Sequence, residues 1–241
     1  MFNASQFDEV VQRVNQKTPE VARKASKIDE EVCRILNDLL LPPEVASIII
    51  YAKNEIIKLA EEFLHIMHEV IEGIGAPIKM WQNSYSWETL RGVASGTAVD
   101  VNALGSIGNW SGGAASAYST AVGPQAGAAA QLASIADSVS SSLTTSAEAG
   151  AAFYLAVAAS LVQFISAEAS AVAGAATVVG TAPGLLAGLG GGAGALALLL
   201  GAVSLIVSFI ATMATQMSTL HGLAVDSTAF PFGRWPVAAN I

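Results

Sequence analysis

The clearest grouping of residues that could perform chemistry is Glu62-x-x-His65, which His68 and Glu69 follow. Di-iron helical bundles hold their metals with Glu-x-x-His motifs that occur on two facing helices and point inward. Here the motif occurs once. At 3.6 residues per turn its side chains lie opposite the apolar stripe that contains Phe63. The pattern therefore predicts a solvated helix face and not a metal site.

A glycine-rich stretch between Gly188 and Gly194 contains Gly-x-Gly-x-x-Ala, a pattern found in dinucleotide-binding loops. Such a loop needs a strand before it and a helix after it in a β-α-β unit, and no strand pattern precedes this one. No Gly-x-Ser-x-Gly nucleophile motif occurs, and His65, His68 and His221 have no Ser or Cys arranged beside them. We therefore predict a non-enzymatic protein with no catalytic residues, metal site or cofactor.

The composition narrows the fold class and the partners. Of 241 residues, 53% are hydrophobic and 12% are charged, whereas typical domains have about 25% charged residues. Alanine and glycine are abundant and alternating β-branched runs are scarce, which predicts an all-α protein. The net charge of −8 argues against a nucleic-acid partner, because phosphates require a basic surface. Cys33 is the single cysteine, so neither an intrachain disulfide nor a cysteine-based zinc site can form.

Charged residues concentrate in the first third of the chain. Ten of the eleven basic residues lie between Arg13 and Arg91, whereas Glu168 is the one charged residue from Ala149 to Val225. The first 30 residues carry several charges and lack the apolar core of a Sec signal peptide. We therefore expect that any export follows a route other than Sec.

Residues 1–80 are expected to form an amphipathic helical hairpin. Apolar residues at three- and four-residue spacing predict a short helix around residues 7–14, a second helix that starts at Thr18-Pro19, and a third from about 45 to 74. Pro42-Pro43 separates the second helix from the third. The apolar positions of the second helix are Val21, Ala25, Ile28, Val32, Ile35 and Leu39.

Residues 81–147 are expected to form a second hairpin with Trp110-Ser111-Gly112 at its turn. Two long runs of small apolar residues flank this turn, from Trp87 to Ile107 and from Ala114 to Ser146. The first run belongs to a helix expected from about Ser84 to Ile107, after a loop or short helix, and its expected inward residues are Trp87, Leu90, Val93, Ala94, Val101 and Leu104. Alanine-rich helices bury little surface each, so we expect the Trp110 ring to be buried between them and to close the hairpin. Gly123-Pro124 predicts a kink or a break in the returning helix.

Trp110-x-Gly112, followed by Ala114-Ala115-x-x-Tyr118, resembles the WxG helical-hairpin proteins that the type VII (ESX) secretion systems of mycobacteria and related bacteria export. The motif-bearing part covers residues 84–146, and the longer chain with its Gly/Ala-rich segment is similar to the ESX secretion-associated Esp proteins. The resemblance makes Trp110, Gly112 and Tyr118 structural residues of the hairpin. It implies a secreted or cell-envelope protein that pairs with a WxG-type helical partner and engages the type VII machinery.

The family's export signal, Tyr-x-x-x-Asp/Glu, follows the hairpin, and this chain departs from that pattern. Its one match is Tyr51-x-x-x-Glu55, which lies upstream of Trp110 and inside a predicted helix. Tyr51 and Glu55 are therefore the candidate signal. An ordinary helix surface would carry the same pair, in which case a paired partner supplies the signal.

Residues 148–225 are expected to form two apolar helices, Ala151 to Val179 and Leu196 to Met213, joined by a glycine-rich connection. A bilayer span needs about 20 apolar residues, which the second segment reaches with its flanks. Glu168 makes the first segment a poorer span, because a carboxylate is costly at a bilayer centre. Gly180-x-x-x-Gly184-x-x-x-Gly188 matches close helix contacts, although a loop explains its first half equally well. Burial in a soluble core and self-assembly into a homo-oligomer are the alternatives.

Residues 226–241 are expected to form an extended tail, with Phe230, Phe232 and Trp235 as anchors on the bundle or at a membrane interface. The whole pattern predicts an all-α, elongated bundle of antiparallel hairpins with a Trp-x-Gly turn and an apolar C-terminal helical pair. We expect a non-enzymatic type VII secretion substrate or secretion-associated structural protein that pairs with a helical partner and self-assembles or contacts membrane. A pore-forming, membrane-inserting helical protein is the alternative, and a resident inner-membrane protein is the third option.

Overall fold

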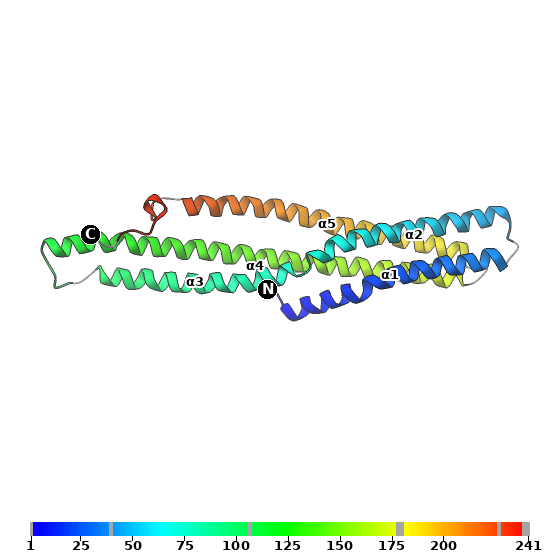
Figure 1. The fold of residues 1–241 in the computed structure, drawn as a ribbon, viewed down its shortest axis with the longest axis horizontal. Coiled ribbons are helices and arrows are strands. Elements are labelled where there is room, and N and C mark those ends of the chain that lie inside the picture. Colours follow the sequence, from blue (N-terminus) through cyan, green and yellow to red (C-terminus); the bar gives the residue numbers. More distant parts are fainter. Residues whose placement is uncertain (1, 39–40, 106–107, 177–180, 226–227, 238–241) are drawn as a thin grey trace. The chain divides into compact units, whose positions relative to one another are not determined.

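A computed structural model describes residues 2–38, 41–105, 108–176, 181–225 and 228–237. The described residues form five α-helices and one short 3-10 helix without strands, which confirms the predicted all-α helical bundle (Figure 1). The elements are α1 (Ala4–Asp38), α2 (Pro43–Glu72), α3 (Ala76–Leu104), α4 (Gly113–Ala175), α5 (Thr181–Val225) and η1 (Pro231–Gly233). Leu39, Ile107, Val179 and Gly180, which the sequence placed in or beside helices, lie outside the described residues.

The chain divides into two compact units, which are described separately. Unit 1 comprises residues 1–76 and 149–208, and therefore contains α1, α2, the second half of α4 and the first half of α5. All four segments contribute to one core, whose centre is the stacked pair Phe63 and Phe164 with 4.4 Å between ring centroids. A second core cluster lies among the same four helices and includes Ile28, Ile49 and Leu185. Unit 1 is thus a four-helix bundle.

One continuous helix, α1, covers residues 4–38, so the prediction of two helices separated at Thr18-Pro19 is wrong. Proline removes a backbone donor and crowds the preceding turn, which usually ends or kinks a helix. Here Val14 and Val21 lie on either side of Pro19, and both are fully buried in the same core. Thr18 Oγ1 also donates a hydrogen bond to the Val14 carbonyl at 2.7 Å. Burial on both sides of Pro19 outweighs the local preference of proline.

The predicted hairpin of α1 and α2 is present. Pro42 occupies the N-cap of α2, and the helix buries an apolar stripe at the predicted spacing: Ile49, Ala52, Ile56, Ala60, Phe63 and Met67. Lys53 Nζ of α2 lies 2.6 Å from Asp29 Oδ1 of α1. At the end of α2, Tyr154 of α4 donates its hydroxyl to the Val70 carbonyl at 2.9 Å. Burial raises the pKa of Tyr154 to about 12, so the hydroxyl keeps the proton that it donates.

Glycine and alanine line the contact between α4 and α5 in unit 1. A Cβ added at Gly188 would lie 2.5 Å from the Cβ of Ala171, and one at Gly191 would lie 2.7 Å from the Cβ of Ala167. A Cβ at Gly184 would collide with the backbone of α4. The described part of the glycine-rich connection is therefore the start of α5 and not a loop, and the close helix contact predicted for Gly184-x-x-x-Gly188 is confirmed.

Unit 2 comprises residues 77–148 and 209–241, and contains α3, the first half of α4, the end of α5 and the tail. Its buried apolar residues are mostly alanines: Ala94, Ala98, Ala126, Ala128, Ala129, Ala136 and Ala147, with Val122. Polar contacts join the helices. Ser140 Oγ donates to the Ser84 carbonyl at 3.0 Å, and Arg91 Nε lies 3.4 Å from Asp137 Oδ1.

The structure extends α3 toward the N-terminus and corrects part of its predicted inward face. The helix begins at Ala76, so the segment before Ser84 is helical and belongs to the same element. Leu90, Val93 and Leu104, which were expected to face inward, are exposed. Ala94 is buried, as predicted, and forms the inward face together with Ser84 and Ala98, because small side chains allow α3 and α4 to approach closely.

Trp110-Ser111-Gly112 lies in the turn between α3 and α4, as predicted, and α4 begins at Gly113. Gly112 has φ +105°, a backbone conformation that favours glycine. The indole ring is not buried. Trp110 is 45% exposed, and its ring contacts Tyr118 of α4 with 5.4 Å between centroids. The prediction of a Trp110 ring buried between the helices is wrong, because the small side chains of α3 and α4 form the buried contacts of this hairpin themselves.

The returning helix continues through Gly123-Pro124, so the predicted break is absent. Val122 and Ala126 are buried on either side of the proline, and the Gln125 side-chain amide donates to the Ala121 carbonyl at 3.3 Å. The helix also continues past residue 147, where the sequence suggested a change of segment. Its second half packs with α1 and α2 in unit 1 and does not form a separate apolar unit with α5.

Adding one methyl group at Gly188 should weaken the fold. Gly188→Ala places a Cβ against Ala171, so we expect the free energy of unfolding to fall by about 1–3 kcal/mol. Gly190→Ala is the matched control, because nothing lies within 4 Å of its added Cβ. Alanine favours helix over glycine there by up to about 1 kcal/mol. Urea denaturation of both variants measures the difference, and equal stability would contradict the close contact of α4 with α5.

Candidate functional site

The helix α5 is apolar around its whole circumference, but only one side of it is covered in unit 1. The buried side is a stripe at three- and four-residue spacing: Leu185, Gly188, Gly192, Ala195, Leu199 and Ala202. Outside the stripe, Leu198 is 53% exposed, Leu205 73% and Val207 60%. Helices that are apolar all round are normally buried in a large core or a membrane. The outer side of α5 is therefore the candidate functional surface.

A row of small side chains runs along α5 opposite the buried stripe. This outer small-residue row consists of Ala197, Gly201, Ser204 and Ser208, which are all exposed. Both serines donate to carbonyls of their own helix, Ser204 Oγ to Leu200 at 2.9 Å and Ser208 Oγ to Ser204 at 3.2 Å. Nothing lies within 4 Å of a Cβ added at Gly201. The row thus presents a flat, apolar strip whose hydroxyl donors are already satisfied.

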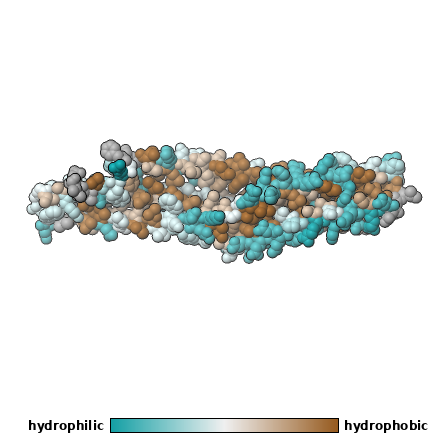
Figure 2. Space-filling model, viewed as in Figure 1, coloured by the Kyte–Doolittle hydropathy of each residue, from teal (hydrophilic) through white to brown (hydrophobic). Residues whose placement is uncertain are grey.

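Large apolar side chains flank the outer small-residue row on both sides. At 3.6 residues per turn, Leu198 and Leu205 lie along one edge and Leu200 and Val207 along the other. In the space-filling view hydrophobic residues lie along α5, whereas hydrophilic residues cover much of α1 and α2 (Figure 2). The outer side of α5 consequently has the profile of a helix-packing surface.

Two described helices are long and apolar enough to cross a membrane by length and composition, α4 and residues 182–225 of α5. In each helix we consider the most apolar stretch of 18 residues. Of this stretch, 33% is buried in α4 and 22% is buried in α5. The stretch in α5 is therefore both the more apolar of the two and the less buried.

Glu168 of α4 is the second unusual feature of unit 1. Its side chain is 1% exposed, and neither carboxyl oxygen has a hydrogen-bond partner among the described residues. It occupies the core-facing stripe of α4, one turn after Phe164 and three residues before Ala171. Burial raises the pKa of Glu168 to about 8, although the positive charge of Lys24 acts in the opposite direction. At neutral pH the folded protein therefore holds a protonated carboxyl in its core.

The candidate export signal lies on the surface of α2. Tyr51 is 62% exposed, and Glu55 follows one turn later on the same helix. Glu55 Oε1 accepts a hydrogen bond from Lys58 Nζ at 2.6 Å. The structure therefore places the pair on a helix surface, with Glu55 engaged by Lys58.

The aromatic tail lies against α4 in unit 2. Phe230 and Trp235 contact each other with 6.0 Å between ring centroids, and Trp235 is 44% exposed. Tail residues Pro231, Arg234, Trp235, Pro236 and Val237 line a cavity of about 630 Å³ with Thr120, Ala121 and Pro124 of α4. The side chain of Phe232 lies outside the described residues. Trp235 therefore lies beside α4, and Phe230 contacts Trp235.

The Glu-x-x-His motif on α2 lies on the solvated face, as predicted. Glu62, His65, His68 and Glu69 are all exposed, whereas Phe63 is fully buried on the opposite side of the helix. His65 Nδ1 and Glu69 Oε1 are 3.9 Å apart. The motif therefore forms part of the hydrophilic surface of unit 1.

The burial of Glu168 and the difference between the two sides of α5 were not predicted from the sequence. The first had a visible signal, because residues 157, 161, 164, 168, 171 and 175 follow core spacing and place the carboxyl on the buried stripe. The second had none, since an all-apolar helix does not reveal which side is covered. No family model matches the chain, and neither do any of the curated proteins or solved structures with which it was compared.

Ionisation of Glu168 should make the stability of the fold depend on pH. Between pH 4.5 and about 8 the unfolded carboxyl is ionised and the folded one is protonated, so unfolding releases a proton. The contribution of Glu168 to the free energy of unfolding is therefore fully present below pH 4.5 and falls by about 1.4 kcal/mol per pH unit up to pH 8. Glu168→Gln, which stays neutral, should remove this slope.

Urea denaturation at several pH values between 5 and 8 measures the slope. Glu61→Gln, on the exposed side of α2, is the matched control and should leave the slope in place. An identical slope in the wild type and in Glu168→Gln would contradict the protonated, buried carboxyl.

Proposed function

We propose that this chain is a non-enzymatic structural protein that works by packing the outer side of α5 against another α-helix. The helix comes from a second copy of the chain or from a WxG-type helical partner. The observation that carries the proposal is the uncovered apolar surface of α5, on which Leu198, Leu205 and Val207 are more than half exposed. Exposed apolar surfaces of this kind mark interaction sites in soluble proteins.

We favour a helix as the partner because both sides of α5 carry a row of small residues. The buried stripe meets α4 through glycine and alanine, and the outer small-residue row repeats that pattern with Ala197, Gly201, Ser204 and Ser208. Small residues allow helix backbones to approach closely, and the flanking leucines then pack around the contact. A small-molecule site would instead need polar groups that fix the orientation of the ligand. The chain has no charged residue from 169 to 225, which includes all of α5.

We further propose that the chain is a type VII secretion substrate or a secretion-associated protein similar to the Esp proteins. The support is the Trp110-x-Gly112 turn between two long helices, the positive φ of Gly112, and the contact of Trp110 with Tyr118. The exposed indole ring gives no support, because the expected burial is absent. Release from a host with a type VII system, and retention in the same host without it, tests this part.

Filling the outer small-residue row should block assembly. Gly201→Leu adds a large side chain at an exposed position where nothing lies within 4 Å, so the fold of the single chain should persist. We expect the association constant of the full chain to fall about tenfold or more, which corresponds to about 1.4 kcal/mol. Gly96→Leu on α3 is the matched control, since that glycine is also exposed with nothing within 4 Å.

Sedimentation velocity over a range of concentrations, with and without the candidate partner, measures the association. Equal association of Gly201→Leu and Gly96→Leu would contradict the proposed surface. A chain that stays monomeric alone and with a partner would overturn the proposal as a whole.

Membrane insertion of α5 is the second candidate function. It is favoured by the uncharged, poorly covered apolar window of α5 and by the serines that bond to their own helix, as a bilayer demands. Dye release from vesicles distinguishes the two functions. If the wild type and Gly201→Leu both release the dye, insertion is supported. If the wild type assembles but releases no dye, the helix-packing proposal is supported.

A further inference from the structure

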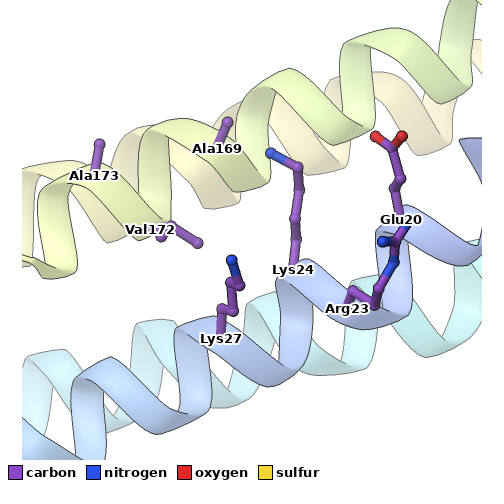
Figure 3. Close-up of a pocket in the computed structure, with 7 residues that line it drawn as sticks. All are labelled: Glu20, Arg23, Lys24, Lys27, Ala169, Val172 and Ala173. Atoms are coloured by element: carbon purple, nitrogen blue, oxygen red, sulfur yellow. The ribbon is translucent and has the colours of Figure 1, made fainter.

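Three basic side chains of α1 line a pocket whose opposite wall is formed by small uncharged residues of α4. Arg23, Lys24 and Lys27 line a cavity of about 410 Å³ together with Glu20 and with Ala169, Val172 and Ala173 of α4 (Figure 3). The side chains of Lys24 and Lys27 extend from α1 toward α4. All these residues belong to unit 1. We refer to this cavity as the α1–α4 pocket.

The positive charge of the α1–α4 pocket is not balanced by its own residues. Glu20, the one acidic residue among the described residues that line the pocket, is paired with Lys17, whose Nζ lies 2.9 Å from Glu20 Oε1. The hydrogen bond from Lys17 lowers the pKa of Glu20, and the charges of Arg23 and Lys24 act in the same direction, so three cations lie near one carboxylate. Lys27 has no hydrogen bond or ion pair among the described residues. The acidic group that acts on Lys24 from α4 is Glu168, which is protonated in the folded protein at neutral pH. In a chain with a net charge of −8, this pocket is a local excess of cations.

The opposite wall explains why the pocket is open. Alanine at positions 169 and 173 leaves space that longer side chains would fill, and none of the described α4 residues that line the pocket is acidic. The Arg23 Nε donates to the Pro19 carbonyl at 3.4 Å, which leaves the terminal nitrogens of the guanidinium available. The pocket thus offers two ammonium groups and one guanidinium around an empty volume.

A phosphate group fits this arrangement better than a carboxylate. Its three or four oxygens can accept hydrogen bonds from several donors at once, and its charge of nearly −2 matches more than one cation. Lysine binds phosphate as a point charge, and arginine binds it through its planar fork of donors. The volume of about 410 Å³ is sufficient for a phosphate ester and falls within the usual range of ligand sites.

We infer that the α1–α4 pocket binds a phosphate-bearing anion through Arg23, Lys24 and Lys27. The inference is independent of the helix-packing function proposed for α5, because it uses different residues of unit 1. A soluble phosphate monoester and the headgroup of phosphatidic acid, which is a lipid phosphate monoester, present the same chemistry to these residues.

Two probes separate the sources of the phosphate. Inorganic pyrophosphate, titrated into the full chain by calorimetry, represents a soluble phosphate anion. Vesicles of phosphatidic acid and phosphatidylcholine, compared with phosphatidylcholine alone in a flotation assay, represent a membrane surface. We expect at least one probe to bind, with affinity that falls steeply as the salt concentration rises.

The double variant Lys24→Gln/Lys27→Gln should weaken this binding by about tenfold or more, since each charge-assisted hydrogen bond to phosphate is strong. Lys58→Gln/Lys79→Gln is the control, because it removes the same charge from two exposed lysines on α2 and α3. The control should change binding by less than about twofold, within the effect of a distant, screened charge. Lys27→Gln alone, at an exposed residue, provides the comparison should the double variant fail to fold.

Each outcome decides the inference. Pyrophosphate binding that depends on Lys24 and Lys27 supports a soluble phosphate anion as the ligand, and vesicle binding with the same dependence supports a lipid headgroup. Absence of binding to both probes, or equal weakening by the control, overturns the inference. Neither result changes the expected effect of Gly201→Leu on assembly, so the two proposals fail separately.

Discussion

The close packing of α5 on α4 is the constraint on which the rest of unit 1 depends. Gly188 and Gly191 bring the two backbones so near that one added methyl group would meet Ala171 or Ala167. A contact of this kind buries little area per residue, because the side chains involved are small. The larger residues of α1 and α2, with Phe164 and Leu199, must then supply the bulk of the core.

The same constraint produces both functional features of the unit. A helix that makes its contact through one glycine-lined side leaves its leucines and valines on the other sides, where Leu205 and Val207 are exposed. The small wall of α4 likewise leaves open space beside Lys24 and Lys27 of α1. The exposed side of α5 and the α1–α4 pocket therefore both result from the small residues of α4 and α5.

The sequence predicted most of the helices because apolar spacing is a local signal. The stripe from Ile49 to Met67 and the turn at Trp110 could be identified in this way. The errors occurred where a local rule was outweighed by packing. Pro19 and Pro124 lie inside helices because buried residues flank each proline on both sides.

Other features could not be read from the sequence because they depend on which surfaces meet. A glycine-rich run weakens a helix in isolation. Gly188 nevertheless lies in a helix, because the close approach of α4 leaves no room for a side chain at this position. The ring of Trp110 was expected in the core by its size, but the alanine faces of α3 and α4 meet without it. The pocket beside Lys24 required knowledge of which part of α4 lies opposite α1.

The central claim is that one side of α5 is buried by its own chain and that the other side is exposed and binds a second helix. Cysteine accessibility tests it directly, in a Cys33→Ser background that removes the single native thiol. Leu199→Cys lies on the buried side, where Leu199 is 0% exposed, and Leu205→Cys lies on the exposed side, where Leu205 is 73% exposed. Reaction with a water-soluble maleimide should be slow at position 199 at every protein concentration. At position 205 it should be fast in dilute protein and slow once the chains associate. Equal rates at both positions in dilute protein would contradict the account.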